Sequence, residues 1–419
     1  MLTAHAPGLP RSLPLPWSPM TLTVSVPESR PRLSPSFPFP PAQVLPGRAA
    51  TARLPYGNPL FGRSDLETDV GLGGMNGLFG GLELAAHPAA WTPQVAALLA
   101  RAGFELPRVT LYASRGEYRA ALGDLWRRCG PIVTMFPQHP DDLPPTQAAL
   151  DPALLTRLAD KGQLDALTGC LAPRRTLRNA PSALRAAARA LRNAPHGWVL
   201  KASHAPTGGG ADVHFCPDEA ALAAAAARYP AGTPLLLEPR LSVDLSPSAQ
   251  LAVLPSGEVR LLGLTTQRLA GPRFAGVDLK PLARAARYAQ LAQEVAQACA
   301  AQGYRGVLGV DLLDTGAEVL VAEVNPRLTG GSLAGLLTPQ LGLLGLQARL
   351  VIHPSARTLD DLCARVGEGW EEGRLLPVMV WDGARWGGVN RVAALLLGRT
   401  DAELDGQDAW LRARLDGGS

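Results

Sequence analysis

Two apolar segments in the second half of the chain are predicted to pair as a β-hairpin. The segments are 306–313 (GVLGVDLL) and 318–325 (EVLVAEVN), and the turn Asp314-Thr315-Gly316 lies in the connection between them. Branched and apolar residues favour strands, and an Asp/Gly-containing connection is typical of a tight turn. Each segment carries an acid within this apolar surrounding, Asp311 in the first and Glu323 in the second. Acids in such apolar strands need partners, which constrains what the hairpin does.

The same hairpin predicts a cluster of oxygen ligands. Glu323 and Asn325 are two residues apart, so their side chains point to one face of a strand, and pairing brings Asp311 near both. Two carboxylates and an amide oxygen suit Mg²⁺, with Mn²⁺ as the alternative cation. Arg327 occupies the next position on that face, where its guanidinium would reach a phosphate or carboxylate. The alternative interpretation is that the acids are solvated strand residues.

Lysine usage points to a second charged group. Of the 40 basic residues only Lys161, Lys201 and Lys280 are lysines. A lysine that occurs within a motif is therefore a candidate for a role that arginine cannot fill. Lys201 lies in the predicted strand 198–203, just before the glycine-rich segment 203–210. Glycine amides approach phosphate oxygens closely, and a lysine beside them acts as a point charge. An ordinary loop is the alternative, and the order differs from a Walker A motif because the lysine precedes the glycines.

These elements together resemble the ATP-grasp superfamily over residues 151–354. The most specific part is Val310-Asp311 followed by Ala322-Glu323-Val324-Asn325-Pro326-Arg327, which is similar to the D…ExNxR signature of that family. The resemblance implies bound ATP and Mg²⁺. It assigns the metal to Asp311, Glu323 and Asn325, a catalytic phosphate contact to Arg327, and ATP contacts to Lys161, Lys201, Gly208, Gly209 and Gly210.

The resemblance also places the nucleotide base and ribose. The segment 235–241 (LLLEPRL) is similar to the hinge between the two α/β subdomains of the family. There Glu238 would bond the adenine amino group, next to Leu241, and Asp244 is the nearest acid that would hold the ribose. Gln267 and Arg268 lie where substrate-facing residues often fall in the family, although a plain strand end is an equally good interpretation.

The fold class that we expect is α/β, with an N-terminal α/β domain ahead of the ATP-grasp domain and a small C-terminal domain. The expected divisions are a proline-rich disordered leader (1–50), a pre-ATP-grasp domain (51–150), the ATP-grasp domain (151–354) and a C-terminal domain (367–419). This architecture resembles the ATP-grasp peptide ligases that carry a pre-ATP-grasp domain, such as the pheganomycin-type ligase. Translation starting at Met20 is an alternative to a start at Met1.

Periodicity and turn signals place further elements. We expect helices over 91–102, 182–193 and 281–302, the last opened by Pro281 and striped by Tyr288, Leu291, Val295 and Cys299. Strands are expected over 108–113, 131–136, 198–203, 234–238 and 376–381, with a hairpin formed by 249–254 and 259–264. A capping box at Thr400 and Glu403 predicts a final helix.

The function that follows is an ATP-dependent carboxylate–amine ligase that works through an acyl phosphate and releases ADP. The substrates would be small-molecule or peptide carboxylates and amines. A kinase on the same fold and a non-catalytic ATP sensor or scaffold remain alternatives. The net charge of +4 is too small and dispersed for nucleic acid, and no apolar run reaches the roughly 20 residues of a membrane helix. Five widely spaced cysteines suit the cytoplasm and predict neither zinc nor disulfides, and no oligomeric state is predicted.

Overall fold

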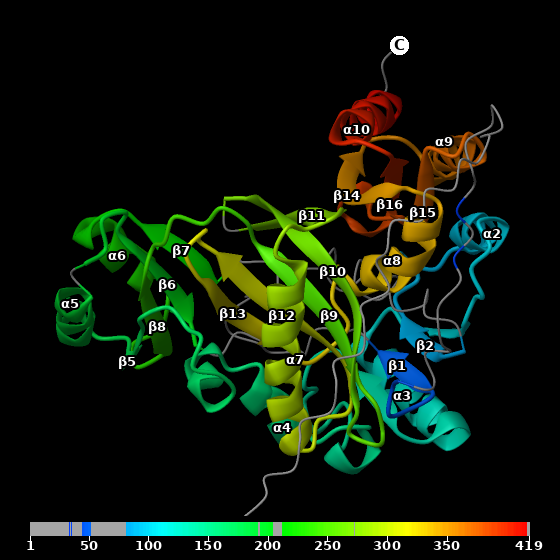
Figure 1. Cartoon of the computed structure of the whole chain (residues 1–419). Coiled ribbons are helices and arrows are strands. Elements are labelled where there is room, and N and C mark those ends of the chain that lie inside the picture. The colour runs from blue at the N-terminus through cyan, green and yellow to red at the C-terminus, as the bar shows by residue number, and fades with distance from the viewer. Residues whose placement is uncertain are drawn as a thin grey trace, which may run out of the picture.

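Helices pack on three separate β-sheets in the computed structural model of the chain (Figure 1). The structure describes residues 33, 35, 44–51, 81–191, 193–203, 212–271 and 273–416. This arrangement confirms the mixed α/β class. No helix within these ranges has both the length and the apolar character that crossing a lipid bilayer requires.

The N-terminal sheet is parallel, with strand order β3-β2-β1-β4. Its elements are β1 Ala49–Thr51, β2 Glu83–Ala86, α2 Pro93–Arg101, β3 Arg108–Leu111, α3 Arg115–Cys129 and β4 Ile132–Thr134, followed by a 3₁₀ turn at Pro145–Gln147. The strands and the helix predicted here from 91 to 136 therefore form. The folded part also begins before residue 51, because β1 starts at Ala49 and the side chains of Leu33, Val44 and Leu45 are buried.

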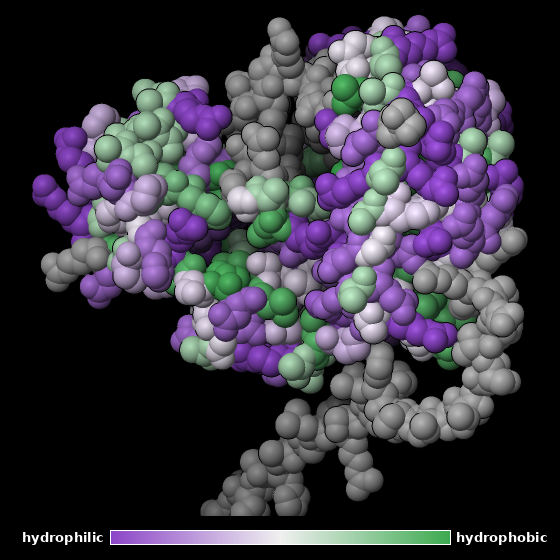
Figure 2. Space-filling model, turned by 90° about the horizontal axis from the view of Figure 1, so that it is seen from above, coloured by the Kyte–Doolittle hydropathy of each residue, from purple (hydrophilic) through white to green (hydrophobic). Residues whose placement is uncertain are grey.

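A small antiparallel sheet follows, with strand order β5-β8-β6-β7. Its elements are β5 Arg175–Arg178, α5 Pro181–Ala190, β6 Trp198–Ala202, β7 Val213–Cys216, α6 Glu219–Ala226 and β8 Pro234–Pro239. The two helices share one apolar core with the strands, and the lobe lies at the left of Figure 1. Seen from above, the lobe again lies beside the main body, at the left of Figure 2. The preceding α4 Pro152–Leu158 and the 3₁₀ helix η3 Lys161–Ala166 connect the lobe to the rest, since η3 contacts both β8 and β13.

The third sheet has eight strands in the order β13-β12-β9-β10-β11-β14-β16-β15. Its first part contains β9 Pro247–Val253, β10 Val259–Ala270, β11 Arg273–Leu279, α7 Ala285–Ala301, β12 Gly306–Asp314, β13 Val319–Asn325 and α8 Ser332–Leu343. Both predicted hairpins form, β9 with β10 and β12 with β13. Helix α7 covers one face with the predicted stripe of buried residues, Tyr288, Leu291, Val295 and Cys299.

The start of α7 corrects one prediction. The helix begins at Ala285 and not at Pro281, and Arg284 is its N-cap residue. Proline at position 281 favours a helix start by its fixed φ. However, Leu282 packs against the core under α7 while residues 281–284 remain outside the helix, so tertiary packing overrides the local signal.

The large sheet continues without interruption into the C-terminal part of the chain. Its remaining elements are β14 Gln347–Ser355, α9 Leu359–Glu371, β15 Leu375–Trp381, a 3₁₀ turn at Ala384–Trp386, β16 Asn390–Gly398 and α10 Asp401–Leu415. Strand β14 pairs with β11 on one side and with β16 on the other. The expected division at residue 354 therefore lies within one continuous sheet.

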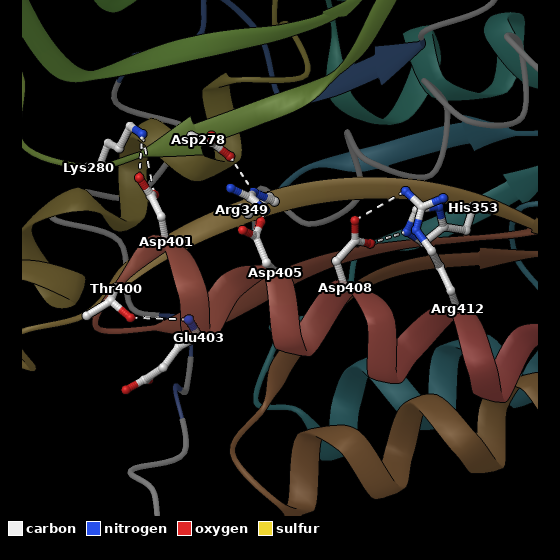
Figure 3. A network of polar contacts seen from close by, with 10 residues as sticks. All are labelled: Asp278, Lys280, Arg349, His353, Thr400, Asp401, Glu403, Asp405, Asp408 and Arg412. Atoms are coloured by element: carbon white, nitrogen blue, oxygen red, sulfur yellow. Dashed lines mark hydrogen bonds and ion pairs between the residues drawn. The ribbon is translucent and has the colours of Figure 1, made fainter.

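Helix α10 is attached to this sheet through charged side chains (Figure 3). Asp401 lies 3.1 Å from Lys280 Nζ, Asp405 contacts Arg349, and Asp408 lies 2.7 Å from His353 Nε2. The spacing of these acids places them on one helical face. The predicted cap is present, since the Thr400 hydroxyl accepts a hydrogen bond from the Glu403 amide.

Candidate functional site

The predicted oxygen cluster forms on one face of the β12–β13 hairpin. In the strand register Asp311 lies directly opposite Glu323, and Gly309 lies opposite Asn325. The Asn325 side-chain amide donates a hydrogen bond of 3.0 Å to the Asp311 carboxylate. The other face of the hairpin is apolar and packs under α7. The three residues predicted to hold a metal ion are therefore brought together.

The two acids of the cluster are not equivalent. Burial, and then the negative charge of Glu323, raise the pKa of Asp311 to about 6, although a hydrogen bond of 2.7 Å from the Ser248 hydroxyl opposes this shift. Burial also raises the pKa of Glu323, but the charges of Lys161 and Arg327 outweigh it, so the net shift is downward. Two carboxylates that face each other repel, and this repulsion fits a site that takes a divalent cation.

The donor set fits magnesium better than a softer metal. It contains carboxylate and amide oxygens, and Mg²⁺ prefers oxygen ligands and retains water or phosphate oxygens in its shell. Across the described part of the chain, no three His, Cys, Asp or Glu side chains form a metal-binding group. A cation held by two acids and one amide would thus complete its coordination with atoms from outside the protein.

Lys161 connects the hairpin to the small lobe. Its side chain is only 3% exposed, and its Nζ lies 3.2 Å from Glu323 and 3.3 Å from Asp212. Burial alone would lower the pKa of Lys161, but the two carboxylates raise it, so the ammonium stays charged. The backbone amide of Lys161 donates to the carbonyl of Ser203, which follows β6. The lysine is therefore fixed beside the candidate metal ligands.

Lys201 and Glu238 form an ion pair between neighbouring strands β6 and β8. The Lys201 Nζ lies 2.7 Å from one Glu238 oxygen, and an Arg174 nitrogen lies 3.1 Å from the other. The charge of Lys201 also contributes to the lowered pKa of Glu323. Glu238, predicted to bond adenine, thus contacts two cations in this structure, and its role toward adenine remains a prediction.

Arg327 contacts both the hairpin and the N-terminal domain. Its guanidinium carbon lies 4.8 Å from the centre of the Phe136 ring, just after β4. Burial lowers the pKa of Arg327, and the charges of Glu323 and Asp311 partly offset that shift. The arginine therefore lies between the acid cluster and the carboxyl edge of the N-terminal sheet.

The other residues that were predicted to contact ATP show no contact with the acid cluster in the described part of the structure. Gly208, Gly209 and Gly210 lie outside the described residues. Leu241 is partly buried after the end of β8. The exposed Asp244 lies at the turn of the β12–β13 hairpin, where its amide donates to the carbonyl of Asp314.

Asp314, the contact of Asp244, lies three residues after Asp311 along β12, which is about 10 Å at the spacing of a strand. Asp244 is therefore set apart from the acid cluster. By contrast, the side chain of Gln267 is near enough to Asp311 to lower the pKa of that carboxyl.

Sequence reasoning missed four residues that complete the site, namely Arg174, Asp212, Ser248 and Gln250. Arg174 joins the lobe to the first lysine, because its guanidinium also donates to the carbonyl of Lys161 at 2.8 Å. Asp212 is the second partner of Lys161, 51 residues away in the chain. None belongs to a recognisable motif, and only the alternation of Ser248 and Gln250 in a strand hints that they share a face.

Comparison with known proteins agrees with this architecture. Residues 248–331 match the family model of the ATP-grasp domain, and residues 43–156 match that of the L-aspartate–L-methionine ligase N-terminal domain. No curated protein sequence matches the chain.

Solved structures with a similar fold include three that the chain covers almost fully. The ADP complex of N5-carboxyaminoimidazole ribonucleotide synthetase is 13% identical with a TM-score of 0.57, covering 79% of this chain and 90% of that one. An ATP complex of carboxyaminoimidazole ribonucleotide synthase from Aspergillus clavatus is 12% identical with a TM-score of 0.55, covering 76% and 94%. The L-amino acid ligase from Bacillus licheniformis is 14% identical with a TM-score of 0.52, covering 88% and 97%. At these identities the likeness establishes the fold.

Proposed function

We propose that this chain, an ATP-dependent ligase of the ATP-grasp superfamily, joins a substrate carboxylate to an amine with release of ADP and phosphate. The observation that supports this most is the pair Asp311 and Glu323, opposed in the strands with Lys161 bound to one of them. Amino acids or short peptides are the substrates that we propose. The N-terminal match to a ligase of two amino acids and the similarity to an L-amino acid ligase support that choice.

The reaction proceeds in two steps. A carboxylate oxygen attacks the γ-phosphorus of ATP, the bond to the β-phosphate oxygen breaks, and an acyl phosphate and ADP result. The amine nitrogen then attacks the acyl carbon, phosphate leaves, and the nitrogen loses a proton. Both steps ask the protein mainly for positioning and for neutralisation of charge. The chain needs no side-chain nucleophile for them.

Asp311, Glu323 and Asn325 would hold magnesium on the face of the hairpin. Bound there with ATP, Mg²⁺ supplies neutralisation of the negative charge on the phosphate oxygens. Lys161 and Lys201 hold phosphate oxygens as point charges, and Arg327 stabilises the transferring phosphoryl group. Because Lys201 lies 2.7 Å from Glu238, a phosphate competes with that carboxylate for the ammonium.

The nucleotide contacts that complete the proposal lie on the lobe and after the hinge. Gly208, Gly209 and Gly210 contact the phosphates, Glu238 and the chain at Leu241 hold the adenine, and Asp244 holds the ribose.

An ADP-release screen over pairs of amino acids and short peptides tests this function. We expect ADP only when a carboxylate and a free amine are both present, together with a ligated product of matching mass. AMP as the product would contradict the acyl-phosphate chemistry. A stable phosphorylated substrate without any amine would identify a kinase, and nucleotide binding without turnover over the whole panel would identify a sensor or scaffold.

The matched control for this screen is the double variant D311N with E323Q. Both changes keep the shape of the side chains and remove their charge. We expect loss of turnover with an unchanged circular dichroism spectrum. Undiminished turnover in this variant would overturn the metal assignment.

A further inference from the structure

A fully buried glutamine joins the acid cluster to the segment that carries Arg327. Gln250 lies on β9 and has no exposed surface. Its side-chain nitrogen donates to the Ser248 hydroxyl at 2.9 Å. Its oxygen accepts from the hydroxyls of Thr329 and Ser332, each at 2.9 Å. One amide thus holds both β9 and the chain that follows β13.

The hydrogen bonds of this group run in one direction. The Ser248 hydroxyl donates to the Asp311 carboxylate at 2.7 Å. Two hydroxyl donors on the Gln250 oxygen fix which end of the amide faces Ser248. The amide nitrogen then supplies a donor to Ser248, so the single hydroxyl proton of that serine is directed at Asp311. Gln250 therefore determines the direction of the hydrogen bond through which Ser248 holds Asp311, a candidate metal ligand.

Glycines bring helix α8 close enough for these contacts. A Cβ on Gly335 would lie 3.0 Å from the Gln250 Cγ, and one on Gly331 would lie 3.0 Å from its Nε2. On the neighbouring strand, a Cβ on Gly263 would lie 2.6 Å from the Gly335 carbonyl oxygen. The side chain of Gln250 is enclosed and has no room to turn.

We propose that Gln250 is a positioning residue of the metal and phosphate site. It acts on Asp311 through Ser248 and on the 327–332 segment through Thr329 and Ser332, so the acid cluster and Arg327 keep a fixed spacing. This inference rests on the proposed function, because it concerns the same site. Groups that hold metal ligands from behind typically contribute about 10–100-fold to metal affinity.

The test measures nucleotide binding with and without a divalent cation in the Q250M variant. Methionine keeps the length of the side chain and removes its hydrogen bonds. We expect titration calorimetry to show that Q250M binds ATP about 10-fold more weakly in excess Mg²⁺. Its affinity in EDTA stays within about twofold of the unchanged chain, and Mn²⁺ binding followed by electron paramagnetic resonance weakens in parallel.

A buried glutamine elsewhere provides the matched control. Gln407 on α10 is 2% exposed and accepts a hydrogen bond from Arg374 at 3.1 Å, far along the sheet from the acid cluster. We expect Q407M to lower the unfolding midpoint as Q250M does and to leave both affinities unchanged. Equal loss of affinity in Mg²⁺ and in EDTA, or unchanged affinity in both, would overturn the positioning role of Gln250.

A milder variant keeps the test decisive if Q250M fails to fold. S332A removes one of the two donors to the Gln250 oxygen, and we expect the same cation-dependent loss at a smaller size. Unchanged Mg²⁺-dependent affinity in a folded S332A protein would then count against the proposal. Failure of the proposed function itself would be distinguishable, because it would appear as absence of amine-dependent ADP release in the wild-type protein, whereas this test measures the cation-dependent difference in ATP affinity.

Discussion

Two regions of the molecule bury charged side chains, and they balance those charges differently. Under α10 each buried acid faces a cation, as Asp278 does with Arg349 and Asp408 does with Arg412, and His353 also contacts Asp408 (Figure 3). On the β12–β13 hairpin, Asp311 faces another acid, Glu323, and it accepts hydrogen bonds from the uncharged side chains of Ser248 and Asn325.

The difference separates a structural network from a binding site. Buried charges that are fully paired within the protein require nothing further, and removing one partner leaves the other uncompensated. Opposed carboxylates instead carry a cost that an external cation would relieve. If this comparison is right, changes in the two regions have opposite consequences for stability and for nucleotide use.

Loss of Lys161 should have the largest effect on turnover. In K161M the ammonium beside Glu323 is absent, so we expect kcat/KM for ATP to fall by about 10³-fold. Steady-state ADP release measures this. K280M is the control, because Lys280 pairs with Asp401 at a partly exposed position on the other charged region. A comparable loss in K280M would remove the distinction between the regions.

Loss of Arg349 should have the largest effect on stability. R349M leaves Asp278 buried without its cation, and breaking such a pair typically costs about 3–5 kcal/mol in the free energy of unfolding. Urea denaturation measures the change. Specific activity per folded molecule should stay unchanged, and its collapse alongside stability would show that the α10 network takes part in catalysis.

The α10 network should also give stability a specific dependence on acid pH. Burial opposes ionisation of Asp408, but hydrogen bonds and charges from His353 and Arg412 outweigh it and lower the pKa of Asp408 to about 2. Because the pKa of Asp408 is lower in the folded state than its unfolded value near 3.8, the ionised carboxylate stabilises the folded state at pH values above 3.8. This contribution to the free energy of unfolding, about 2 kcal/mol, is lost as the pH falls toward 2. Between pH 4 and 2 we expect the free energy of unfolding to fall less steeply in D408N than in the wild-type protein. Denaturant unfolding curves recorded at a series of pH values measure the two slopes.

The smallest expected effect is a gain in the free energy of unfolding, where the preceding variants are expected to lose stability or activity. Removing one of two opposed acids relieves their repulsion, so D311N should stabilise the metal-free protein by about 1 kcal/mol at pH 7. Thermal unfolding in EDTA measures the shift, and addition of ATP with Mg²⁺ should stabilise the unchanged chain but not D311N. Destabilisation of D311N in EDTA would mean that Asp311 is an ordinary structural acid.

The sequence alone anticipated the acid cluster because its signals are local. Strand alternation, a short turn and the spacing from Glu323 to Arg327 predict which residues share a face, and the register of β12 with β13 confirms the pairing. The stripe on α7 was predicted for the same reason, since helical periodicity lies within one segment.

Contacts between distant segments could not be anticipated. Gln250 meets Thr329 across 79 residues and Lys161 meets Asp212 across 51, and no pattern in one sequence links such positions. The nine-residue strands β14 and β16 were not predicted either, because periodicity does not separate a continuously buried apolar strand from part of a buried helix.

The most direct test of the account locates the cation itself. Crystals grown with Mn²⁺ and a non-hydrolysable ATP analogue would give an anomalous difference map. We predict one or two peaks between the carboxylates of Asp311 and Glu323, beside the β- and γ-phosphates and facing Lys161 and Lys201. Nucleotide and manganese bound away from that hairpin face would contradict the central claim.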